Sequence, residues 1–136
     1  MQAEATNGYV PLILGPLGFT APSYLESVLS PHLTPDELAQ YKVQWSRSGA
    51  YEAMNKWYSA NLSPTLTLPT GVTIDSPTLA IWGMDDTFVT PSELDHLPKY
   101  VRQLEVQRLT GVDHWVTHQR TDQVFGWIRE FHARLP

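Results

Sequence analysis

The spacing of hydrophobic positions along the chain changes near residue 78. Before it, apolar side chains recur every three or four positions over residues 33–45 and 49–62, which predicts two amphipathic helices. After it come two short runs, residues 78–82 and 104–109, that are typical of strands buried in a sheet, and a helix-forming segment follows each. The pattern therefore predicts helices first and then a strand, helix, strand, helix unit.

Helix start signals support two of these helices. Thr34 and Glu37 suit the N-cap and capping-box positions of the first helix, with a proline in the first turn between them. Residues 90–93, Thr-Pro-Ser-Glu, have the same form. A helix is therefore expected to begin near Thr90 and to end or kink at Pro98.

The other helices are expected from their apolar stripes. The last helix follows a cap at Thr121 or Asp122, and its stripe contains Val124, Trp127, Ile128, Phe131 and Leu135. The helix over residues 49–62 carries a stripe that contains Ala50, Ala53, Met54, Trp57 and Tyr58. Residues 63–77 are rich in Pro, Thr, Gly and Ser, so they are predicted to connect residues 1–62 to residues 78–136.

Composition narrows the class of protein. At 136 residues, 42% hydrophobic and 17% charged, the chain is long enough for one globular domain that buries about two-thirds of its unfolded surface. A net charge of -5 without a basic cluster argues against nucleic acid or an anionic membrane as a partner. The apolar stretch at residues 9–19 is broken by Pro and Gly and follows no basic segment, so neither a membrane span nor a secretory signal is expected. The lack of cysteine excludes disulfides and thiolate chemistry and favours a cytoplasmic location.

Candidate catalytic residues follow the two predicted strands. The first strand runs into Gly83, Asp85 and Asp86, and the loop after the second strand carries His114. A crossover makes the two strands parallel, so both loops leave the same sheet edge, about 4.8 Å apart if the strands are neighbours. An aspartate that accepts a histidine ring N–H fixes the tautomer and leaves the other nitrogen free to act as a base. We therefore expect Asp86 and His114 to meet as a catalytic pair.

The remaining carboxylate and histidines are assigned other roles. Asp85 is expected to cap or solvate the turn, because Asp86 lies further into the loop and can turn toward the neighbouring loop. The other histidines are expected on helix faces, beside the site or on the surface: His32, His96, His118 and His132.

These motifs resemble the α/β-hydrolase superfamily, most closely its epoxide hydrolase and haloalkane dehalogenase branch. The likeness is carried by PTLAIWGMDDTFVTP, with its Gly-x-x-Asp end, and by LTGVDHWVTHQRTDQVFGWIREFHARL. Residues 33–62 are similar to the end of that branch's helical cap. The resemblance implies an α/β fold class: a partial cap region within residues 1–62, the connector 63–77, and the C-terminal βαβα part of an α/β-hydrolase fold over 78–136.

The resemblance also implies a role for each site residue. Asp86 is the triad acid, His114 is the general base, and Tyr58 donates a hydrogen bond to the epoxide oxygen. Tyr51 is a second donor, and Trp115 is a substrate contact. The implied substrate is a small hydrophobic epoxide or an ester-like molecule, and no metal or organic cofactor is required. The departures from the family pattern are Lys56 and Ser59 beside the Trp-Tyr pair, and Asp113 where a glycine usually precedes the histidine.

The family's nucleophile has no counterpart in this sequence. It is an Asp or Ser on a strained turn between an earlier strand and helix, and the nearest segment, WSRSGA, has no strand before it. The oxyanion-hole segment is missing as well. We therefore expect a truncated chain that lacks the N-terminal half of the fold, is inactive alone and self-associates through exposed apolar surface.

Several other functions stay open. A dehalogenase would use the same Asp86 and His114 with halide donors such as Trp57 or Trp115, and a serine esterase or carbon–carbon hydrolase would differ in the nucleophile. A receiver-like magnesium pocket at Asp85 and Asp86 would require the acidic pair on an early strand and a lysine after a later one. The last alternative is an inactive, non-enzymatic fragment.

Overall fold

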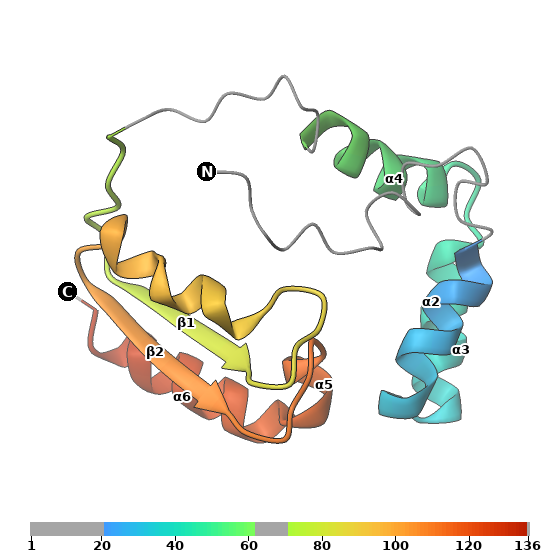
Figure 1. Cartoon of the computed structure of the whole chain (residues 1–136). Coiled ribbons are helices and arrows are strands. Elements are labelled where there is room, and N and C mark those ends of the chain that lie inside the picture. The colour runs from blue at the N-terminus through green and yellow to red at the C-terminus, as the bar shows by residue number, and fades with distance from the viewer. Residues whose placement is uncertain (1–20, 62–70, 136) are drawn as a thin grey trace. The chain divides into compact units, whose positions relative to one another are not determined.

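The computed structural model describes residues 21–61 and 71–135 of the chain. Residues 21–61 belong to one compact unit and residues 71–135 to another (Figure 1). Residues 1–20 and 62 of the predicted 1–62 region, and residues 63–70 of the predicted connector, lie outside the described residues.

The first unit is helical, as predicted. Its elements are α2 (Ala21–Leu29), the 3-10 turn η1 (Ser30–His32), α3 (Pro35–Trp45) and α4 (Ala50–Asn61). The predicted capping box of α3 is confirmed, since Thr34 Oγ1 accepts from the Glu37 amide at 3.3 Å and Glu37 Oε2 accepts from the Thr34 amide at 2.8 Å. Helix α2 was not predicted, because its Pro and Ser resemble the Pro- and Gly-rich segment before it.

Two apolar side chains are buried among the described residues of this unit. Leu29 of α2 and Trp45 of α3 are buried, and the Lys42 ammonium of α3 lies 2.8 Å from the Glu26 carboxylate of α2. The predicted aromatic stripe of α4 is only partly covered, because Trp57 is 60% exposed.

The second unit is built on two parallel strands. Strand β1 (Thr78–Gly83) pairs with β2 (Leu104–Leu109) in a register that runs from Thr78 opposite Leu104 to Gly83 opposite Leu109. The predicted pair of neighbouring parallel strands is thus confirmed. The strands are less buried than expected: only their last residues are fully buried, because each strand has one strand neighbour among the described residues.

The crossover between the strands differs from the prediction. It consists of two 3-10 segments, η2 (Pro91–Asp95) and η3 (Leu97–Lys99), in place of an α-helix. The expected capping box is wrong, because the Thr90 hydroxyl lies 2.7 Å from the Ser92 hydroxyl and makes no side-chain cap. Pro98 has no amide hydrogen and cannot donate the hydrogen bond that an α-helix would need at this position. This favours short 3-10 segments in the crossover.

Two helices follow β2: the four-residue α5 (Val116–Gln119) and the long α6 (Thr121–Ala133). The cap predicted for α6 is wrong, because Thr121 is already helical and its hydroxyl donates to the Thr117 carbonyl at 2.7 Å. Figure 1 shows α6 and the η2–η3 crossover on opposite sides of the strand pair.

A small apolar core lies between the strands and α6. Leu109, Val112 and Val124 are buried, and Ile81, Val116 and Trp127 pack against them. The predicted stripe of α6 is only partly covered, since Ile128 is 42% exposed and Leu135 is 39% exposed. This core fixes the ends of both strands, where the candidate site lies.

Candidate active site

The loops that leave β1 and β2 are in direct contact. The Met84 amide donates to the Leu109 carbonyl at 2.9 Å, and the Asp85 amide donates to the Val112 carbonyl at 2.9 Å. A β-carbon on Gly83 would collide with the backbone carbonyl oxygens of Val112 and Asp113. Glycine is therefore required at the end of β1 by the close approach of the second loop.

Both carboxylate oxygens of Asp86 make hydrogen bonds, and its side chain is only 8% exposed. Its Oδ1 accepts from the Phe88 amide at 2.8 Å and from the Val89 amide at 2.9 Å, which closes the turn after β1. Its Oδ2 lies 2.9 Å from Nδ1 of His114. Two backbone donors thus hold the carboxylate in the orientation that presents its second oxygen to the histidine.

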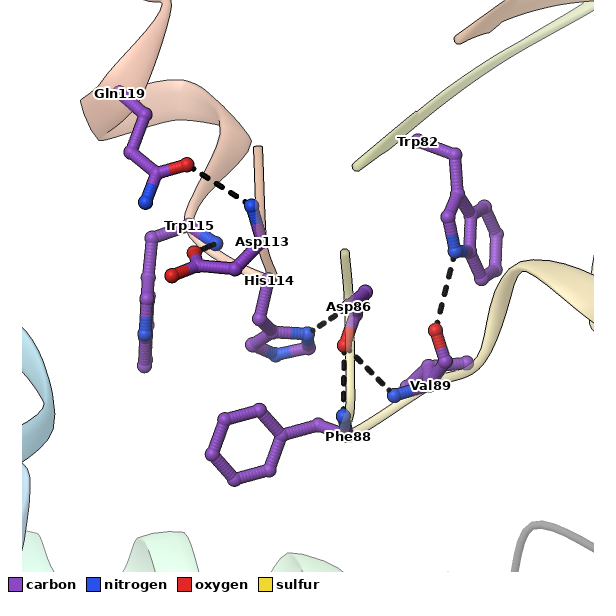
Figure 2. Close-up of polar contacts among 8 residues, drawn as sticks. All are labelled: Trp82, Asp86, Phe88, Val89, Asp113, His114, Trp115 and Gln119. Carbon is purple, nitrogen blue, oxygen red and sulfur yellow. Dashed lines mark hydrogen bonds and ion pairs between the residues drawn. The ribbon is translucent and has the colours of Figure 1, made fainter. Parts of the chain in front are cut away.

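His114 is oriented by this contact. A carboxylate only accepts hydrogen bonds, so the donor in this contact is the Nδ1–H of the imidazole. Figure 2 shows the second ring nitrogen turned away from Asp86. The histidine side chain is 37% exposed, in contrast to the buried carboxylate. The predicted meeting of the two loops is confirmed, and the arrangement leaves Nε2 available to accept a proton.

Two aromatic rings flank the imidazole. The Phe88 ring lies 5.1 Å from it at an angle of 51°, and the Trp115 ring lies 5.2 Å from it, edge-on at 84° (Figure 2). The indole N–H of Trp82 in β1 donates to the Val89 carbonyl at 3.1 Å, which ties the Phe88 turn to the strand. Sequence reasoning did not find Phe88; its position two residues after Asp86, where an aspartate commonly bonds a following amide, is the signal that was available.

The other predicted site residues are placed as follows. Asp85 is exposed and binds the second loop through its amide, so its side chain does not join the pair. Tyr51 is half-buried in α4, within the helical unit. Tyr58 lies in the same helix, but its side chain is outside the described residues. The structure brings Asp86, His114 and Trp115 together and leaves the two tyrosines as predictions.

No metal-binding arrangement is present in residues 21–61 and 71–135, where no group of three or more His, Cys, Asp or Glu side chains converges. In the same residues, no helix has the length and hydrophobicity to cross a membrane.

The chain is similar to known hydrolases in sequence and in fold. No family model matches the chain. An AB hydrolase superfamily protein of Bacillus subtilis, YfhM, is 27% identical over 99 residues, which are 72% of this chain and 34% of that protein.

Solved structures of epoxide hydrolases share the fold. One, from metagenomes of hot environments, superposes with a TM-score of 0.68 at 20% identity, over 93% of this chain and 50% of its own. Potato (Solanum tuberosum) epoxide hydrolase I superposes with a TM-score of 0.64 at 28% identity, over 79% of this chain and 36% of its own. Bacillus megaterium epoxide hydrolase in complex with an inhibitor gives a TM-score of 0.66 at 20% identity, over 98% and 46%.

The predicted resemblance to the α/β-hydrolase superfamily and its epoxide hydrolases is thereby confirmed, and so is the fold class. The chain has the C-terminal part of an α/β-hydrolase fold. It spans about a third of the length of its curated relative and at most half the length of these solved structures.

Proposed function

We propose that this chain, as the C-terminal part of an α/β-hydrolase fold, supplies the histidine base and its orienting carboxylate to an epoxide hydrolase. The observation that carries the proposal is the 2.9 Å contact between His114 Nδ1 and Asp86 Oδ2 at the carboxyl ends of two parallel strands. Active sites of open α/β sheets lie at this edge. The likeness to epoxide hydrolases supports the substrate class.

The first chemical step belongs mainly to the other half of the enzyme. A carboxylate nucleophile carried by that half attacks one carbon of the epoxide ring, and the bond between that carbon and the ring oxygen breaks. The ring oxygen takes a proton from the hydroxyl of Tyr58, with Tyr51 as a second donor. The product is an ester between enzyme and substrate that carries a free hydroxyl group.

The second step uses the pair described above. Nε2 of His114 removes a proton from water, and the water oxygen attacks the carbonyl carbon of the ester. The ester bond breaks, the diol leaves, and the carboxylate nucleophile is restored. His114 then releases its extra proton to solvent, and the Tyr58 phenolate takes one up, so both residues return to their starting state. Asp86 stabilises the imidazolium that forms on His114, because its Oδ2 accepts the Nδ1–H while two amides hold Oδ1. The steps consist of ester formation and proton transfers, so we propose no metal or organic cofactor.

The surroundings of His114 suit an apolar substrate. Phe88 and Trp115 place aromatic rings within about one ring diameter of the imidazole, at 5.1 and 5.2 Å between centroids. Aromatic walls bury apolar substrate surface and limit the entry of bulk water. We propose Trp115 as a substrate contact on this basis.

Turnover of three substrate classes tests the proposal. The protein to use joins this chain to the N-terminal part of an α/β-hydrolase fold, and the substrates are an apolar epoxide, a haloalkane and an aryl ester. The epoxide is expected to be hydrolysed fastest. Tyr58→Phe is expected to slow epoxide ring opening, with Tyr100→Phe in the other unit as the matched control.

The outcomes separate the proposal from its alternatives. A preference for the haloalkane or the ester would replace the epoxide assignment with a dehalogenase or an esterase, while keeping Asp86 and His114 in their roles. Turnover of an epoxide at the parent rate by His114→Gln would contradict the assignment of the base. The exposed His132→Gln variant is the control for the loss of one histidine.

A further inference from the structure

Side chains accept hydrogen bonds from the amides of the two residues that flank His114. The Asp113 amide donates to Oε1 of Gln119 at 3.0 Å. The Trp115 amide donates to Oδ1 of Asp113 at 2.9 Å. Both contacts are visible in Figure 2, where Gln119 reaches back from the end of α5 to the segment before the histidine.

These contacts form part of a closed ring of hydrogen bonds. The third member is the Gln119 amide, which donates to the Trp115 carbonyl at 3.0 Å. The ring runs from Asp113 to Gln119, from Gln119 to Trp115, and from Trp115 back to Asp113. This ring of hydrogen bonds includes the amides of both neighbours of His114. Its members Asp113, Trp115 and Gln119 are half-buried.

From this arrangement, we propose that Asp113 and Gln119 are positioning residues that hold the imidazole of His114 on Asp86. The Trp115 amide lies in the peptide group that follows His114, and the Asp113 amide lies in the peptide group before Asp113. The two contacts therefore restrain the backbone from Asp113 to Trp115, which carries the histidine. The imidazole then lies where its Nδ1 meets Oδ2 of Asp86. Glycine at position 113 has no acceptor for the Trp115 amide, so the aspartate performs a function that glycine cannot.

The inference rests on the proposed function, because it takes His114 as the base, but its test needs no turnover. Long-range proton–nitrogen spectra of the nitrogen-15-labelled chain report which ring nitrogen of His114 carries the proton when the ring is neutral. Amide hydrogen exchange of Asp113 and Trp115 reports the two contacts separately. A failure to hydrolyse epoxides would leave both measurements unaffected.

The decisive variants remove or retain the acceptor at one position at a time. Gln119→Leu is expected to speed exchange of the Asp113 amide by about two- to tenfold, the effect of losing one hydrogen bond, and to lower the fraction of His114 protonated on Nδ1. Gln119→Glu retains the acceptor oxygen, so the parent values are expected to return. Asp113→Gly is expected to speed exchange of the Trp115 amide and to lower the Nδ1-protonated fraction of His114. Asp113→Asn retains an acceptor oxygen and is expected to return both quantities to the parent values.

A purely structural role would give a different result. In that case Gln119→Leu and Asp113→Gly would lower the stability of the whole chain, while the Nδ1-protonated fraction of His114 stayed at the parent value. That result would overturn the proposal, as would equal effects of Gln119→Leu and Gln119→Glu. If Gln119→Leu does not fold, the comparison of Asp113→Gly with Asp113→Asn decides by the same criteria.

Discussion

Gly83→Ala tests how tightly the two catalytic loops are joined. The added β-carbon would overlap the carbonyl oxygens of Val112 and Asp113, which are backbone atoms and cannot rotate away. Relief requires the second loop to move, which breaks the hydrogen bond from the Asp85 amide to the Val112 carbonyl. Overpacking costs about 1–3 kcal/mol, and each lost hydrogen bond costs about 1 kcal/mol. We expect the free energy of unfolding to fall by about 2–4 kcal/mol.

Urea unfolding followed by circular dichroism measures this loss, and Gly126→Ala is the control. Gly126 lies inside α6, and a β-carbon there would meet no atom within 4 Å. Replacing a helical glycine with alanine is expected to raise stability by about 0.5–1 kcal/mol. The two glycine substitutions should therefore shift the unfolding midpoint in opposite directions. Equal midpoints for Gly83→Ala and the parent chain would refute the close contact between the loops.

Three further predictions concern stability and association. Asp86→Ala removes every acceptor of a buried carboxylate and is expected to cost about 2–4 kcal/mol in urea unfolding, more than Asp86→Asn, which keeps one carbonyl oxygen; equal costs would argue against the contacts of this residue. Thr34→Ala removes the capping box of α3 and is expected to cost about 1 kcal/mol, visible as reduced helicity, whereas unchanged helicity would contradict the cap. Phe125 and Ile128 of α6 are 48% and 42% exposed, so the chain is expected to self-associate in sedimentation and to bind an apolar dye. Serine at both positions should favour the monomer, and a monomeric parent without dye binding would contradict this expectation.

The meeting of Asp86 and His114 was predictable because it follows from topology. Parallel neighbours end at one edge of a sheet, so the loops after β1 and β2 had to lie together once the strands were recognised. Asp86 was the better choice over Asp85 for a physical reason that the structure also shows. One oxygen of Asp86 accepts hydrogen bonds from two backbone amides, and this holds its second oxygen toward the histidine.

Other features depend on torsions and contacts that a sequence pattern does not specify. Thr-Pro-Ser-Glu at residues 90–93 matched a helix start, but the Thr90 hydroxyl turned to Ser92 and the crossover became 3-10. Phe88 and Gln119 were missed because their contacts with the His114 loop depend on the path of the backbone. Hydrophobic spacing indicates where a helix lies, but not which backbone amide its last side chain reaches.

Intact mass spectrometry of His114→Gln is the most direct test of the pair's catalytic role. The variant is prepared in a protein that also contains the upstream half of the fold, and it is mixed with excess epoxide. If His114 is the base that activates water, ring opening still proceeds and hydrolysis of the ester stops. The protein mass is then expected to rise by the mass of one epoxide and to remain there, while the parent and His132→Gln return to their original mass. Rapid return of the variant to its original mass, with diol released at the parent rate, would contradict the role of His114.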